Sequence, residues 1–168
     1  MSDLANLIPE GLIPVPIGVS LGNAFACDWV NVGLAEMAWI VVSGSKIAAA
    51  SIVCTPQKAY AAAGTGATAL TVNVPIWAGL TIAGVPTPKM TRQADAVNYT
   101  TAATAGVHTV VFQIDPASLG VEGSTPSLGP YNFIGGTYVS LVADALSVVC
   151  YMVPRYAGNP LYAPTYLA

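Results

Sequence analysis

Short apolar runs separated by glycine and proline shape this chain of 168 residues. The clearest run covers residues 107–114 and ends at Asp115 and Pro116. Runs of this length that are rich in β-branched and aromatic residues and bounded by Gly, Ser or Pro are typical of strands. Further strands are predicted at residues 37–43, 47–54, 67–74, 97–101, 137–142 and 146–153. Turn signals recur roughly every 8–15 residues and no long helical pattern appears, so we expect an all-β fold, a single β-sandwich or jelly roll.

The segments between these runs read as turns and loops. Residues 64–66, Gly-Thr-Gly, predict a turn, and residues 115–120 predict a single helical turn capped by Asp115. Residues 75–88 and 122–136 are longer, irregular and rich in Gly and Pro. Loops of that length are candidate contact regions for a partner.

Both ends of the chain combine proline with apolar residues. Pro9, Pro14 and Pro16 fall in the first 22 residues, where proline removes backbone donors and prevents a helix. We therefore expect an extended N-terminal arm at residues 1–22, a β-sandwich at 23–156 and an extended C-terminal arm at 157–168. The N-terminal arm either lies across its own domain or reaches a neighbouring subunit.

Charge is the second constraint, because only 8% of the residues are Asp, Glu, Lys or Arg. Soluble domains average about 25%. A surface so poor in charge tends to associate, so we expect copies of the same chain or a larger assembly to cover much of it. The cations are scattered and form no basic stripe, which argues against nucleic acid or an anionic membrane as a partner. They are Lys46, Lys58, Lys89, Arg92 and Arg155.

A membrane span and an export signal are not expected. Residues 59–88 carry no charge, but Gly and Pro interrupt them, so a continuous apolar helix of about 20 residues does not fit. No Lys or Arg precedes Lys46, whereas a secretory signal needs a positive start. We expect the chain to be made in the cytoplasm.

Residues that carry catalytic or metal chemistry are sparse. Cys27, Cys54 and Cys150 lie far apart without a CxxC pair, which favours buried free thiols over disulfides or a zinc site. The single histidine, His108, is predicted to be a surface or half-buried strand residue. No carboxylates are paired at a spacing typical of acid–base catalysis or calcium binding. We expect no enzyme, no cofactor, no metal site and no catalytic residue.

Aromatic residues gather near the C-terminus, with Arg155 among them. Tyrosine and arginine are enriched at protein interfaces, although these side chains can also pack on their own domain. The arms and this cluster supply the candidate contacts with other subunits or with a shell. They are Leu7, Ile8, Leu12, Ile13, Arg155, Tyr156, Tyr162 and Tyr166.

Four segments in order carry a family resemblance: residues 62–70, 111–119, 138–141 and 153–158, the last reading Val-Pro-Arg-Tyr-Ala-Gly. This series resembles small virion proteins of tailed bacteriophages, often encoded among the head genes. The resemblance spans about residues 40–158 and implies a capsid decoration (cement) protein. Such proteins are compact β domains, commonly trimeric, with arms that bridge capsomers. The loop at 75–88 is longer than the family pattern.

From these observations we expect a protein of the phage head surface that stabilises capsomer contacts. Its partners would be copies of itself, with a homotrimer favoured, and the major capsid protein. A first alternative is a tail or head-fibre component that binds a host receptor or glycan through an exposed aromatic such as Trp77 or Tyr131. A second alternative is that the chain is itself a major jelly-roll capsid protein.

Overall fold

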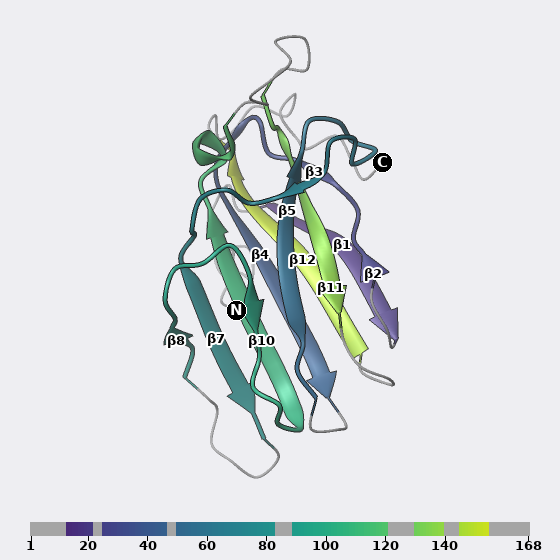
Figure 1. The fold of residues 1–168 in the computed structure, drawn as a ribbon, viewed down its shortest axis with the longest axis vertical. Helices are drawn as coiled ribbons and strands as arrows, with labels where there is room; N and C mark the ends of the chain where they lie inside the picture. Colours follow the sequence, from purple (N-terminus) through teal and green to yellow (C-terminus); the bar gives the residue numbers. More distant parts are fainter. Residues whose placement is uncertain are drawn as a thin grey trace, which may run out of the picture.

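The computed structural model describes residues 13–21, 25–46, 50–82, 89–120, 130–139 and 145–154, and the structural statements below concern these residues. They form two antiparallel sheets packed face to face, with one short 3-10 turn (Figure 1). The all-β sandwich expected from the sequence is confirmed.

The first sheet is built around two long strands whose side chains alternate mainly between buried and half-buried. β4 (Ala35–Lys46) and β10 (Gly106–Ile114) pair from Gly106 opposite Lys46 to Ile114 opposite Ala38. The strand order is β1-β12-β4-β10-β7-β8. The remaining members are β1 (Ile13–Leu21), β12 (Ala145–Pro154), β7 (Ile76–Thr81) and β8 (Thr91–Arg92).

The second sheet is narrower. β11 (Phe133–Val139) and β5 (Val53–Ala59) form its centre and pair along their full lengths. Short strands flank them: β2 (Phe25–Ala26) and β3 (Val30–Asn31) on β11, and β6 (Thr68–Ala69) and β9 (Tyr99–Thr100) on β5.

The strand order is that of a jelly roll. β1-β12-β4-β10 in one sheet faces β2/β3-β11-β5-β9 in the other, so early and late strands alternate as two interleaved Greek keys. β6, β7 and β8 lie between β5 and β9 in the chain, and β7 and β8 extend the first sheet beyond β10. The first sheet therefore has two strands at its β8 edge that the jelly-roll order does not require.

The core lies between the sheets and is almost entirely apolar. Every second residue of β10 points into it, and Phe112 and Ile114 are fully buried. Ile40 on β4, Ile134 on β11 and Val148 on β12 are buried in the same layer. The period-two alternation of the two-faced strands is what the hydrophobic pattern of the sequence predicts.

Residues 13–21 of the predicted N-terminal arm are extended, as expected, but they form strand β1 on their own domain, so the predicted start of the sandwich at residue 23 is too late. β1 pairs with β12 at the edge of the first sheet, and Ile17 is buried in the core. Pro14 and Pro16 are exposed on this edge strand. An edge strand has a neighbouring strand on one side only, so the N–H that proline lacks need not break a bond within the sheet. The sandwich thus begins before residue 23, and residues 1–12 and 157–168 lie outside the described part.

Two predicted loops contain strands. Residues 76–81, expected to be irregular, form β7, and residues 133–136, assigned to the loop at 122–136, begin β11. Glycine made both look loop-like. At Gly136 an added Cβ would lie 2.7 Å from the Thr55 carbonyl oxygen, and at Gly135 it would lie 2.9 Å from Trp29 Cε3. These glycines allow close packing within a strand.

Of the other local predictions, one is confirmed and two are confirmed only in part. The capped turn is confirmed: residues Pro116–Leu119 form a 3-10 turn, and the Asp115 carboxylate accepts a bond from the Ala117 N–H at 2.9 Å. The predicted strand at 67–74 is reduced to β6 and an isolated bridge at Val74, and the strand expected at 47–54 begins only at Val53. Residues 47–49 lie outside the described part.

Candidate functional site

The predicted contact residues fall almost wholly outside the part of the chain that the structure describes. Ile13 alone is placed: it begins β1, opposite Met152 of β12. The others lie in segments that are not described: Leu7, Ile8, Leu12, Arg155, Tyr156, Tyr162 and Tyr166. The structure therefore leaves these contacts as predictions.

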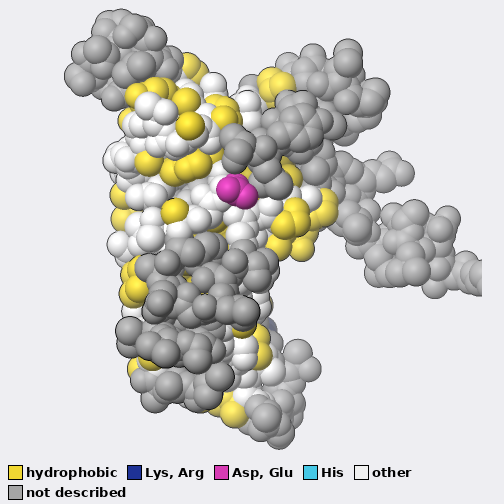
Figure 2. All heavy atoms as spheres, turned by 90° about the vertical axis from the view of Figure 1, so that its right-hand side faces the viewer, with side chains coloured by type: hydrophobic (Ala, Val, Ile, Leu, Met, Phe, Trp, Pro, Cys, Tyr) yellow, Lys and Arg dark blue, Asp and Glu magenta, His cyan; other side chains and the backbone are white. Residues whose placement is uncertain are grey.

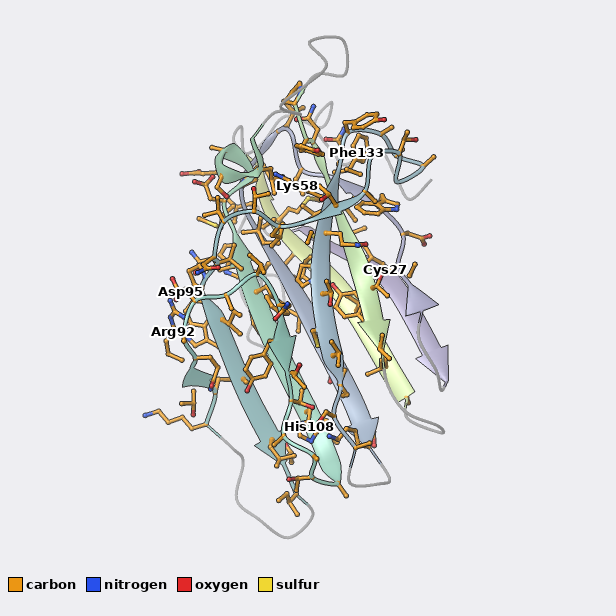
Figure 3. The ribbon with its side chains drawn as sticks, viewed as in Figure 1. Cys27, Lys58, Arg92, Asp95, His108 and Phe133 are labelled. Carbon is orange, nitrogen blue, oxygen red and sulfur yellow. The ribbon has the colours of Figure 1, made fainter. Side chains whose placement is uncertain are left out.

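Neither aromatic residue suggested as a receptor platform has an open ring. Tyr131 is buried, which contradicts its placement on an exposed loop, and the Lys58 ammonium lies 4.4 Å from its ring centroid. Trp77 is half-buried on β7, with the Arg92 guanidinium carbon 4.9 Å from its ring centroid. Arg92 also pairs with Asp95, and Figure 3 shows the two beside each other at the β8 edge.

The structure instead reveals a groove where the first sheet extends past the second. Ala78 and Leu80 lie opposite Val110 and His108 in the β7–β10 register, on the inward face of the sheet. They are only half-buried, because the narrower second sheet does not reach over β7. The resulting groove has a volume of about 360 Å³. Its walls come from residues 89–102: Lys89, Thr91, Gln93, Tyr99, Thr101 and Ala102.

His108 lies at one end of this groove, near the lower ends of β10 and β4 in Figure 3. It is 4% exposed, so the prediction of a surface or half-buried residue is wrong. Its Nε2 lies 2.8 Å from the Thr104 carbonyl oxygen. A ring nitrogen bonded to a backbone carbonyl orients the imidazole and ties the turn at 104 to β10.

Two buried lysines are the features that sequence reasoning missed. Lys58 on β5 is 4% exposed, and its ammonium donates to the Leu119 carbonyl at 2.5 Å and to Thr71 Oγ1 at 3.0 Å. Together with the Tyr131 ring these groups replace the water that the ammonium loses. Burial lowers the pKa of Lys58. Lys58 thus fastens β5 to the 3-10 turn and to the segment after β6.

Lys46 performs a similar role at the end of β4. It is 3% exposed, and its ammonium donates to the carbonyl oxygens of Ala50 and Ala102 and lies 3.4 Å from Thr101 Oγ1. Thr101 Oγ1 also accepts a bond from the Ile52 N–H at 2.9 Å. Since Thr101 and Ala102 line the groove, Lys46 holds one of its walls in place.

The three cysteines are buried free thiols, as predicted, although they come from distant parts of the chain. Burial raises the pKa of the Tyr138 phenol and the three thiols add to the rise. Cys54 lies opposite Tyr138 in the β5–β11 register. Desolvation raises the pKa of Cys27, Cys54 and Cys150 each to about 12. Protonated, buried thiols of this kind are chemically inert.

This burial predicts the reactivity of the thiols. In the native protein at pH 8 we expect no reaction with a disulfide reagent such as 5,5'-dithiobis(2-nitrobenzoic acid), because the attacking thiolate is not formed and the reagent cannot enter the core. In denaturant all three thiols should titrate at once. Rapid release of the chromophore by the native chain would contradict the packing described here.

The described surface is poor in charge and carries scattered apolar side chains. Figure 2 shows the β1/β2 side of the molecule, where charged side chains are almost absent from the described part and hydrophobic ones are spread over it. Val53 and Val139 are paired neighbours on β5 and β11, and both are exposed. Other large exposed apolar residues are Leu34, Val72, Ile82, Met90 and Val107.

Metal ligands and membrane-spanning helices are not found within the described ranges. No group of three His, Cys, Asp or Glu side chains there is placed to hold a metal ion. Nor is any helix among those residues long and apolar enough to cross a bilayer.

Comparison with known proteins gives no family. No protein-family model matches the chain, and no curated protein matches it.

Proposed function

We propose that this chain is a structural subunit of a bacteriophage virion, and specifically a capsid decoration protein that binds the outer head surface and stabilises capsomer contacts. The proposal rests on one observation: few charged residues lie at the described surface of this jelly roll. Of the four cationic residues in the described part, Lys46 and Lys58 are buried, which leaves Lys89 and Arg92 at the surface. The described surface thus carries fewer cations than the composition alone indicates, while Asp28, Glu36, Asp95 and Asp115 remain exposed on it.

The proposed partners follow from that surface. A sandwich with exposed valines and few ions gains free energy by burying area against copies of itself and against the major capsid protein, at about 25 cal/mol per Å² before association costs. A homotrimer is the favoured oligomer, since several weak contacts around one axis add through multivalency. We propose no role for nucleic acid, membrane, cofactor or catalysis.

Binding to phage heads tests this proposal. Purified chain mixed with heads that lack it should co-sediment saturably. Truncations that remove residues 1–12 or 157–168 should weaken attachment roughly tenfold or more while both sheets stay folded, because each removes one point of a multivalent contact. Removing residues 1–21 is unsuitable, since it also deletes β1 and the buried Ile17. Full-length chain that stays in the supernatant at all concentrations would refute the proposal.

A major capsid protein is the second candidate, and the jelly-roll strand order is the observation that favours it. Expression of the chain alone separates the two candidates. Closed particles visible by electron microscopy would favour the shell protein, whereas small soluble oligomers would favour decoration. A tail or head-fibre component that binds a receptor or glycan is the remaining alternative, and the groove lined by Tyr99 is the observation that favours it.

A further inference from the structure

We propose that the groove between β7, β10 and residues 89–102 binds a saccharide of one or two sugar rings. The groove belongs to the fold itself. It exists because β7 and β8 extend the first sheet past β10, where the narrower second sheet does not reach, and residues 89–102 form the walls of the groove. Lys46 anchors one wall through Ala102 and Thr101. The site is therefore held open by strands and buried hydrogen bonds.

Its size and its apolar surfaces fit a sugar. A volume of about 360 Å³ lies at the lower end of the range for small-molecule sites, about 300–1,000 Å³. The floor consists of the small or aliphatic side chains of Ala78, Leu80 and Val110, and the half-buried ring of Tyr99 forms part of one wall. Sugar rings present C–H faces that pack on such aliphatic and aromatic surfaces, while their edges carry hydroxyl groups.

The polar groups of the groove divide into those already bonded and those available. Thr101 Oγ1 and His108 Nε2 are occupied by the contacts described above. The Tyr99 hydroxyl, the Lys89 ammonium and Gln93 Oε1 make no hydrogen bond to any residue in the described ranges. The Lys89 ammonium is a donor, Gln93 Oε1 is an acceptor, and the Tyr99 hydroxyl can act as either. A ligand with hydroxyl groups needs both donors and acceptors.

The charge of the lining residues limits the kinds of ligand that the groove can bind. Lys89 is the cation at the groove, and no carboxylate is among the lining residues. A cationic ligand would thus have nothing to pair with, whereas a neutral sugar or a sugar acid would be accepted. Affinity for one site should be weak, in the millimolar range. Many copies on one particle would raise the effective affinity by avidity.

Titration of the full-length chain tests the proposal. We expect at least one of the methyl glycosides of glucose, galactose, mannose and N-acetylglucosamine, added to about 50 mM, to shift the amide resonances of Tyr99, Gln93 and His108 saturably. The resonance of Thr68 on β6, which does not line the groove, should stay in place. Absence of saturable shifts with every sugar, including glucuronic acid as the anionic probe, would overturn the proposal.

Variants of the groove residues test whether weaker saccharide binding comes from a lost contact with the sugar or from a less stable fold. Gln93→Leu keeps the side-chain size and removes the amide, including its Nε2 bond to the Thr91 carbonyl oxygen at 3.0 Å. Tyr99→Phe keeps the ring and removes the hydroxyl, and it breaks no bond among the described residues. Each should weaken saccharide binding about tenfold, since a ligand hydroxyl loses its partner. Thr68→Ala is the control and should bind as the wild type does. Unchanged affinity in both groove variants, with melting temperatures equal to the wild type, would also overturn the proposal. The site is independent of the virion proposal, because Gln93→Leu should leave co-sedimentation with heads unchanged.

Discussion

Raising the pH from 9 to 12 should unfold this protein through its cysteines. Each of Cys27, Cys54 and Cys150 has an ordinary pKa of 9.0 that burial raises to about 12. Between these values the unfolded chain releases protons that the folded chain keeps, so the free energy of unfolding falls as pH rises. One thiol contributes about 1.4 kcal/mol per pH unit, and three contribute about 4 kcal/mol per pH unit.

Two other groups modify this slope. The pKa of Tyr138 is raised well above its ordinary 10.0 by the same burial, which adds to the loss at high pH. The pKa of Lys58 is lowered from 10.5, so this one group contributes stability that increases as pH rises toward 10.5. The loss of stability that the three thiols cause as pH rises is larger than the gain from one lysine. Over three pH units the thiols remove about 12 kcal/mol, so a domain whose stability is about 5–12 kcal/mol, most of the typical range, should unfold between about pH 10 and pH 12.

Urea unfolding at several pH values measures this effect. We expect the free energy of unfolding to fall steeply above pH 9 compared with its value at pH 8. The variants Cys54→Val and Cys150→Val should each reduce the slope above pH 9 by about a third, whatever their stability at pH 7. Equal slopes in wild type and variants would show that the thiols do not control alkaline stability.

Replacing Lys58 with alanine should destabilise the fold by roughly 2–4 kcal/mol, although lysine substitutions are usually neutral. The change leaves the buried Leu119 carbonyl without its donor, breaks the bond to the hydroxyl of the exposed Thr71 and removes the cation from the Tyr131 ring. It also opens space in the core beside Leu70 and Ile114.

Thermal and urea unfolding measure this loss, with two comparisons. Lys58→Met restores much of the volume without the charge and should cost less, about 1–2 kcal/mol, since the remaining loss is the unpaired acceptors. Lys89→Ala is the matched control: Lys89 is exposed, and its loss should change stability by about 0.5 kcal/mol or less. A Lys58→Ala variant as stable as Lys89→Ala would contradict the role assigned to the buried ammonium.

The sequence predicts the long central strands well, for a physical reason. In β10 every second side chain faces the core, so the alternation along residues 107–114 is visible without a structure. β7 and the start of β11 were missed because their glycines accommodate neighbouring groups, such as Met90 over Gly79, which only the folded packing reveals. β1 was missed because proline excludes a helix but is tolerated on an edge strand.

The sites were harder to predict than the strands. The groove joins residues from four separate stretches, 78–80, 89–93, 99–102 and 108–110, and no local pattern connects them. A signal for Lys58 did exist: it lies four residues after Cys54, on the same face of β5, so strict alternation would place both in the core. Because lysine is almost always exposed, the alternation alone did not lead to the prediction of a buried Lys58.

The two proposals describe complementary properties of one particle surface. A decoration subunit present in many copies would display as many grooves, and an affinity too weak for a single domain would become effective through avidity. Under the first proposal the charge-poor surface would be covered, whereas the groove presents the polar side chains of Lys89, Gln93 and Tyr99 to a ligand.

Cryo-electron microscopy of phage heads with and without this chain tests the central claim most directly. The account predicts heads of the same lattice in both samples, with additional density on the outer surface, of a size that fits this jelly roll, only when the chain is present. Heads without such density at saturating chain, together with a stable monomer in sedimentation velocity, would contradict it.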